Sequence, residues 1–267
     1  MLININKSKI YILLIFLFSI LFCIKSIRAS EKNNDNFLSE DWWKTATKED
    51  VIKEINNGAN VNAENKLKTT PLMIASSNTK YPENIILLLY YGAKINQKNS
   101  LGNTALIFAS GLNENVKITK VLIKYGANVN EKNNFGWTPL IVASKDNKNS
   151  EIIKTLIKNK ANIDYADKKG MTALMLACIN NSSKDVVIEL LKNGANINKR
   201  DKNKKTPLIH ASASSKNPEI VELLIERGAN ALSADNKDKT AFDYAKLNPY
   251  INKTKVFETL NFIINEQ

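Results

Sequence analysis

Short apolar segments alternate with polar segments along most of the chain, and the alternation repeats at a constant interval. In residues 138–171, for example, an apolar run begins at Pro139 and ends in the polar stretch "KDNKN". A second run follows, in which the apolar positions fall at i, i+1, i+4 and i+5, a spacing that places them on one face of a helix. These positions are Ile152, Ile153, Leu156 and Ile157. The pattern therefore predicts two short helices, the second of them amphipathic, followed by a polar segment.

Residues at the predicted helix boundaries support this interpretation. Thr138 and Pro139 suit the cap and the first turn of the first helix, because the hydroxyl can accept a backbone N–H and proline needs no partner there. Asn149 suits the cap of the second helix. The polar, turn-rich stretch "ANIDYADKKGM", residues 161–171, then predicts a hairpin-like finger that leads to the next repeat.

Two sequence markers show that the interval is 34 residues. A threonine that opens the first helix recurs at Thr70, Thr104, Thr138, Thr172, Thr206 and Thr240. A Gly-Ala pair that ends the second helix begins at Gly58, Gly92, Gly126, Gly194 and Gly228, and Lys160 stands where the glycine is missing. Because glycine can take the left-handed conformation there, we expect Lys160 to cost about 1 kcal/mol relative to glycine. A constant period of this size indicates an array of structural repeats.

Thr-Pro-Leu at the start of the first helix, and Gly-Ala-Asn-Val-Asn at the end of the second, resemble the ankyrin repeat. The resemblance extends over 37–267 and implies an all-α fold, an ankyrin-repeat solenoid of stacked helix-turn-helix units with hairpin-like fingers. It divides this part of the chain into a divergent N-terminal unit, a series of full units and a C-terminal capping unit. The units are residues 37–69, then 70–103, 104–137, 138–171, 172–205 and 206–239, and last 240–267.

One departure from the family pattern lies in the link between the two helices of a unit. The period is one residue longer than the usual one of about 33. The extra residue falls in this link, as in "SSNTKYP" and "SASSKNP". The glycine and histidine that ankyrin repeats usually carry there are absent. The sequence therefore leaves the usual hydrogen-bonded connection between units in doubt, although not the fold.

Residues 1–29 differ from the repeats and resemble a secretory signal. Basic residues precede and follow an apolar run at 10–24, and the small Ala29 offers a cleavage position. At about 15 residues, the run is shorter than the roughly 20 that a membrane-spanning helix needs. We therefore expect cleavage near Ala29, a linker at 30–36, and an extracytoplasmic location, either periplasmic or secreted. The alternatives are an uncleaved membrane anchor formed by 10–24, and lipidation of Cys23, which the large residue before it disfavours.

The charge of the chain argues against a nucleic-acid partner. The formal net charge is +12, and residues 1–29 supply four of these charges with no acid. The remaining excess is spread over the repeats, whereas a nucleic-acid interface needs a basic stripe with residues that read or stack on bases. The lysines do support one alternative function, in which the protein binds anionic surfaces or polymers of the cell envelope.

The sequence contains no recognisable motif for catalysis, metal binding or a cofactor. Its one histidine, His210, stands where other units carry an apolar residue or Tyr244, so we expect a partly buried, hydrogen-bonded side chain. Cys178 is the one cysteine outside 1–29, and it occupies a small-residue position that predicts a buried thiol. We therefore expect neither an enzyme nor a bound cofactor or metal.

The resemblance to ankyrin repeats places the residues just before each threonine on the concave side, formed by the fingers and the inner helices. The middle of this series is aromatic and apolar, and its far end is basic. We expect the protein-binding residues to be Leu101, Asn103, Asn134, Phe135, Trp137, Lys168, Lys169, Met171 and Lys205.

Trp137 is the centre of the resulting hypothesis. We expect it to anchor a protein partner of unknown identity together with its apolar neighbours, because aromatic residues in such patches carry much of the binding energy. The lysines would attract an acidic rim of that partner. The chain would then be a monomeric scaffold for protein-protein interaction. The simpler alternative is that Trp137 and Met171 only cover neighbouring fingers.

Overall fold

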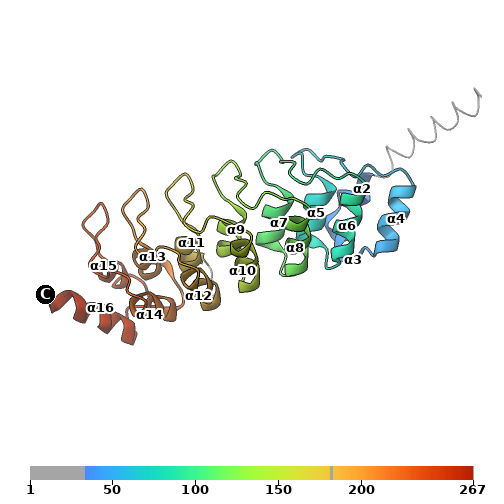
Figure 1. The fold of residues 1–267 in the computed structure, drawn as a ribbon. Coiled ribbons are helices and arrows are strands. Elements are labelled where there is room, and N and C mark those ends of the chain that lie inside the picture. The colour runs from blue at the N-terminus through green and yellow to red at the C-terminus, as the bar shows by residue number, and fades with distance from the viewer. Residues whose placement is uncertain (1–33, 181–182, 267) are drawn as a thin grey trace, which may run out of the picture.

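The chain folds into an array of antiparallel helix pairs, with fingers that project from one side (Figure 1). A computed structural model describes residues 34–180 and 183–266. Within these residues no β-strand forms, and the pairing of Ala166 with Thr172 at the base of one finger is an isolated bridge. The all-α solenoid predicted from the sequence is confirmed.

Each unit contributes a first helix, which lies beside the fingers, and a second helix, which lies on the far side (Figure 1). The first helices are α3 (Glu40–Thr45), α5 (Pro71–Asn78), α7 (Ala105–Leu112), α9 (Pro139–Asp146), α11 (Ala173–Asn180), α13 (Pro207–Ser214) and α15 (Ala241–Ala245). The second helices are α4 (Lys48–Asn56), α6 (Pro82–Tyr90), α8 (Val116–Lys124), α10 (Ser150–Lys158), α12 (Lys184–Lys192), α14 (Pro218–Glu226) and α16 (Lys255–Asn265). A short additional helix, α2 (Asn34–Phe37), precedes α3.

The linker expected over 30–36 has to be shortened at its C-terminal end, because residues 34–36 belong to α2. Phe37 and Trp43 are both fully buried, and their ring centroids lie 5.4 Å apart. The indole Nε1 of Trp43 also donates a hydrogen bond to the carbonyl oxygen of Phe37 at 2.9 Å. These contacts attach α2 to the first unit.

The expected signal or anchor, residues 1–29, lies outside the described residues. In the part of the chain that the structure does describe, no helix has the length and apolar character needed to cross a lipid bilayer.

The recurring threonines cap the first helices. The hydroxyl of Thr138 accepts a hydrogen bond from the N–H of Ile141 at 3.3 Å, and its equivalents in four other units make the same contact three residues on. Asn149 caps α10 by accepting a bond from the N–H of Glu151 at 3.0 Å. The capping predicted from the sequence is confirmed here, since each bond satisfies an N–H group that has no partner within its helix.

The second helices end in the left-handed conformation. The five glycines at this position have φ between 83° and 92°, and Lys160 adopts φ 68°. The left-handed conformation predicted for Lys160 is therefore confirmed. A side chain at this position crowds the following carbonyl oxygen, which is why the lysine should cost about 1 kcal/mol.

The hydrophobic core runs along the array between the two layers of helices. The helix α7 packs between α5 and α9, and α11 packs between α9 and α13. Leucines at equivalent positions of the first helices are at most 1% exposed; they are Leu72, Leu106, Leu140, Leu174 and Leu208. Stability therefore comes from contacts between successive units.

Asparagine side chains supply the hydrogen bonds between units that the sequence left in doubt. The Nδ2 of Asn113 donates to the carbonyl oxygens of Ser76 at 3.1 Å and Thr79 at 2.8 Å, both in the preceding unit. Asn147 and Asn248 make equivalent pairs of bonds in later units. The link between the helices is thus connected to its neighbour by buried amide groups.

A second series of asparagines connects the bases of the fingers. The Nδ2 of Asn62 donates to the carbonyl oxygen of Gly92 at 2.9 Å, and its Oδ1 accepts the N–H of Lys94 at 3.0 Å. Asn96 and Asn130 repeat this pair of bonds toward the units that follow them. Each of these bridges fixes the base of one finger relative to the next.

Candidate binding groove

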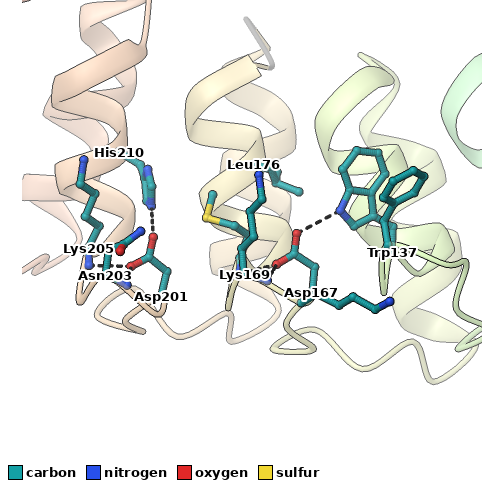
Figure 2. A pocket seen from close by; sticks show the side chains of 11 residues that line it. Trp137, Asp167, Lys169, Leu176, Asp201, Asn203, Lys205 and His210 are labelled. Carbon is teal, nitrogen blue, oxygen red and sulfur yellow. Dashed lines mark hydrogen bonds and ion pairs between the residues drawn. The ribbon is translucent and has the colours of Figure 1, made fainter.

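A groove of about 530 Å³ lies between the fingers and the first helices α11 and α13 (Figure 2). Three consecutive fingers contribute to it. The lining residues are Phe135 and Trp137 from one finger; Asp167, Lys168, Lys169 and Met171 from the next; Asp201, Asn203 and Lys205 from the third; and Leu176 and His210 from the helices. Aromatic rings occupy the end nearest α9, whereas charged and polar groups dominate the other end.

A smaller hollow of about 190 Å³ lies one unit earlier. It is lined by Asn103, Ile107, Phe108, Leu112, Asn133, Phe135, Trp137, Val142 and Asp146. Since Phe135 and Trp137 line both hollows, their rings form the wall between them.

The structure brings most of the residues expected to bind a protein to this groove. Its lining includes Phe135, Trp137, Lys168, Lys169, Met171 and Lys205. Asn103 lines the smaller hollow instead. Leu101 and Asn134 line neither; both belong to the turns of the fingers, where the Nδ2 of Asn134 donates to the carbonyl oxygen of Ser100 at 3.0 Å. Binding by these nine residues stays a prediction.

Trp137 is held in place by three contacts. Its Nε1 donates a hydrogen bond to Oδ2 of Asp167 in the next finger, at 3.0 Å (Figure 2). The ring of Phe135 lies 5.6 Å from it, centroid to centroid, and the Nζ of Lys145 also lies 5.6 Å from its centroid. Trp137 therefore does connect neighbouring fingers, yet its half-buried ring still lines both hollows.

The aspartates of the groove stabilise the turns of their fingers by accepting backbone N–H groups. The Oδ1 of Asp167 accepts the backbone N–H groups of Lys169 at 2.7 Å and Met171 at 2.9 Å. Asp201 does the same for Asn203 and Lys205, at 2.8 Å in both cases. The Oδ2 of each carboxylate contacts a ring nitrogen in the groove. An asparagine has an NH₂ group at that position, which cannot accept a hydrogen bond.

These aspartates are not among the nine residues expected to bind a protein, although the repeat period marks their position. The same position of every finger carries an asparagine or aspartate, namely Asn65, Asn99, Asn133, Asp167, Asp201 and Asp235. The change from asparagine to aspartate occurs where the groove begins. Asp235 also accepts a hydrogen bond from a ring, the hydroxyl of Tyr244, at 2.7 Å.

His210 forms part of the wall at the polar end of the groove. Its Nε2 lies 3.0 Å from Oδ2 of Asp201 (Figure 2), and its side chain is 12% exposed. Burial lowers the pKa of His210 below its ordinary value, and the opposing influence of Asp201 is smaller. We therefore assign a neutral imidazole at pH 7 whose Nε2–H donates to Asp201. The partly buried, hydrogen-bonded histidine predicted from the sequence is confirmed.

Three lysines give the groove its positive charge. Lys168 and Lys169 are exposed on the finger, and the Nζ of Lys205 lies 4.1 Å from the centroid of the Tyr244 ring. Among the described residues none of the three takes part in an ion pair. Their charge is therefore available to an acidic ligand.

The groove contains no arrangement for metal binding or thiol chemistry. Within residues 34–180 and 183–266, no group of three His, Cys, Asp or Glu side chains could hold a metal ion. Cys178 is buried, and burial raises the pKa of its thiol far above the ordinary value. The thiol therefore packs as a small apolar group, as its position in the repeat predicted.

Comparisons with known proteins agree with the geometry. A family model described as "Ankyrin repeats (3 copies)" matches residues 44–133, 112–201 and 185–261. Among solved structures, the human ASB11 ankyrin repeat domain is similar, with a TM-score of 0.69 and 27% sequence identity, over 79% of this chain and 90% of that chain. No curated protein matches the sequence.

Proposed function

Since this chain belongs to the ankyrin repeat family, we propose that it is a protein-binding scaffold whose groove around Trp137 receives an apolar side chain of the partner. Ankyrin repeat proteins are typically interaction scaffolds without enzymatic activity. The finger side of the array, formed by the fingers and the first helices, is the proposed interface. The observation that carries this proposal is a preformed groove with an aromatic wall.

The position of Trp137 favours recognition over a purely structural role. A buried aromatic side chain would satisfy the need to cover a neighbouring finger, but this ring lines two separate hollows. Its hydrogen bond to Asp167 fixes the ring before any ligand arrives, so little side-chain entropy is lost on binding. Fixed aromatic residues next to pockets are the usual centres of binding energy.

The lysines determine which partner surface fits beside the apolar one. Lys168 and Lys169 lie on the finger next to that of Trp137, and Lys205 lies on the finger after it. An acidic rim on the partner would meet them and increase the rate of association. Exposed pairs of this kind contribute at most about 1 kcal/mol each, so the lysines steer the partner while Trp137 anchors it.

Comparative capture tests this function. The full chain, its Trp137→Ala variant and a Tyr90→Ala variant are immobilised in parallel and exposed to the envelope fraction of the source cells. Tyr90 is a matched control, since it is a 79% exposed aromatic residue on α6, on the far side of the array. We expect one protein to be retained by the wild type and by Tyr90→Ala and to be lost from Trp137→Ala. Equal retention by all three would place the site elsewhere.

A salt titration of the captured complex separates this function from the binding of anionic surfaces. A contact made by lysines alone fades steeply with ionic strength, because salt screens exposed charges. Retention that persists at high salt and depends on Trp137 supports the groove. Retention that disappears at high salt and is the same for the wild type and Trp137→Ala supports the binding of anionic surfaces.

The extracytoplasmic location is part of the same proposal. Residues 1–29 support it by their order of basic residues, apolar run and small residue. An intact-mass measurement of the native protein should show loss of about 29 residues if the segment is a cleaved signal. A mass that includes residues 1–29 would instead support an anchor.

A further inference from the structure

The outermost residues of the fingers form a row that changes from apolar to basic along the array. We call these residues the tip row; they are Leu67, Leu101, Phe135, Lys169, Asn203 and Lys237, one from each finger. The first three are 54%, 43% and 52% exposed. The last three are also exposed. The groove of Trp137 lies at the boundary between the two halves.

The tip residues occupy the same position in turns of the same kind. The residue that follows each of them has a positive φ, between 55° and 84°. In the middle of the row, Phe135, Lys169 and Asn203 all line the groove. The middle of the row therefore lies along the groove, on the side proposed to bind the partner.

Backbone hydrogen bonds tie each finger tip to the next and keep the row evenly spaced. The N–H of Ser100 donates to the carbonyl oxygen of Leu67 at 2.8 Å, and that of Asn134 donates to Leu101 at 3.0 Å. Equivalent bonds continue along the later fingers to Asn236, which donates to Asn203 at 3.0 Å. Because packed helices lie about 8–10 Å apart, successive tips have a similar separation. A chain in the polyproline II conformation rises about 3.1 Å per residue and completes one turn every three residues, so every third side chain faces the same side and three residues span one step of the row.

The basic half of the row has little acid to neutralise it. The later fingers expose six lysines: Lys168, Lys169, Lys202, Lys204, Lys237 and Lys239. The carboxylates of Asp167, Asp201 and Asp235 accept backbone N–H groups of their own fingers and ring donors. Asp238, which follows Lys237, is the one exposed carboxylate in these three finger turns. Among the described residues, no ion pair involves any of these lysines. An acidic ligand is the complement that this half of the row fits.

We propose that the tip row binds a polypeptide segment in the polyproline II conformation that has apolar residues at every third position along one half and acidic residues at every third position along the other. The apolar residues lie over Leu67, Leu101 and Phe135, and the acidic residues lie over the basic tips. This inference rests on the proposed function, because it describes how the protein partner continues beyond the groove. It adds a sequence pattern by which such a partner is recognised.

Designed peptides test the pattern without an identified partner. The first is a fluorescein-labelled peptide of about 18 residues, three per tip, with leucine at every third position in one half, glutamate at every third position in the other, and serine elsewhere. The second has the same composition, with leucine and glutamate alternating at those positions. The third keeps the two halves but places the residues at every second position. Fluorescence anisotropy with the full chain measures the three Kd values.

We expect the first peptide to bind at least about ten times more tightly than either control. Leu101→Ser should weaken that binding severalfold, because it removes one apolar tip, and the folded control Tyr90→Ser on α6 should leave it unchanged. Equal Kd values for the three peptides, or equal losses for Leu101→Ser and Tyr90→Ser, would overturn the proposal. Vesicles of anionic phospholipid that bind the chain equally well with and without Leu101→Ser, while the peptides remain indistinguishable, would assign the basic fingers to a membrane surface instead. If the three peptides had equal Kd values while capture of the partner still depended on Trp137, the tip-row proposal would be wrong and the groove proposal would stand.

Discussion

At the scale of single residues, the second oxygen of an aspartate decides the shape of the groove. Both asparagine and aspartate can accept the backbone N–H groups of a finger turn at Oδ1, and the first three fingers carry asparagine. In the next finger, Oδ2 of Asp167 accepts the indole N–H of Trp137. In the one after, Oδ2 of Asp201 faces His210. The aspartates that accept the backbone N–H groups of their fingers thus also orient two rings of the proposed binding surface.

Lys160 carries a backbone strain that a single substitution can relieve. Its φ of 68° is one that glycine adopts freely in five other units. We expect Lys160→Gly to raise the free energy of unfolding by about 1 kcal/mol, the penalty for a side chain in the left-handed region. Urea unfolding of the two proteins measures the difference. A lower stability for Lys160→Gly would mean that the lysine side chain makes contacts worth more than the strain.

His210 should make stability depend on pH. Because burial lowers its pKa in the folded state, the unfolded chain binds a proton more readily than the folded chain. The neutral histidine therefore contributes stability above its unfolded pKa of about 6.5. This contribution is lost progressively as the pH falls from that value toward the lower folded pKa. We expect His210→Gln to flatten the fall in free energy of unfolding below pH 6.5, as followed by denaturant titrations across this range. An unchanged pH profile would contradict the assignment.

At the scale of elements, buried asparagine amides connect successive units, which could not be predicted from the sequence. The links of this chain lack the glycine and histidine that are usual in the family, and the sequence left the connection between units in doubt. The structure shows asparagine donors that reach two carbonyl oxygens of the preceding unit. Leaving a buried donor or acceptor without a partner lowers the free energy of unfolding by more than the hydrogen bond itself contributes to it.

Asn113→Ala should therefore destabilise the array strongly. It would leave the carbonyl oxygens of Ser76 and Thr79 without this donor, and we expect a loss of about 2–4 kcal/mol in the free energy of unfolding. Asn134→Ala is the matched control, because its single bond to Ser100 lies on an exposed finger, and it should cost under about 1 kcal/mol. Chemical denaturation compares the two variants. Similar losses for both would mean that the buried link is not a main source of stability.

The local features of the repeat could be predicted from the sequence because each depends on a few neighbouring residues. The caps at Thr138 and Asn149, and the left-handed Lys160, follow from helix-end chemistry and appear as expected. Contacts between units depend on how two repeats are turned relative to each other, which periodicity alone does not give. For this reason the sequence did not lead to the lining residues Asp167, Leu176, Asp201, Asn203 and His210. Binding by the nine expected residues stays a prediction.

At the scale of the whole molecule, the array has no single core whose loss unfolds everything at once. The last unit covers its neighbour, since α15 packs on α13 and α16 packs on α14. Fully buried apolar residues lie beneath them, among them Leu208, Ile209 and Leu224. Each unit depends on its neighbours for burial, and disturbances at one end should stay near that end.

Removal of the chain from Thr240 onward should therefore cause unfolding from the new C-terminus. The newly exposed apolar face of α13 and α14 destabilises those helices, while α5 to α8 keep their neighbours on both sides. Hydrogen exchange followed by mass spectrometry should show lost protection in residues 207–226 and unchanged protection in 71–124. Uniform loss along the array, or no loss at all, would contradict a stability built from neighbouring units.

The central claim is that the ring of Trp137 anchors a protein partner, and calorimetric titration of the captured partner tests it most directly. We expect Trp137→Ala to weaken binding by about 2 kcal/mol, roughly a thirtyfold increase in Kd. Lys169→Ala should cost under about 1 kcal/mol, as expected for an exposed rim charge. Tyr90→Ala should leave Kd unchanged, and circular dichroism confirms that each variant is folded. The same Kd for wild type and a folded Trp137→Ala variant would contradict the account.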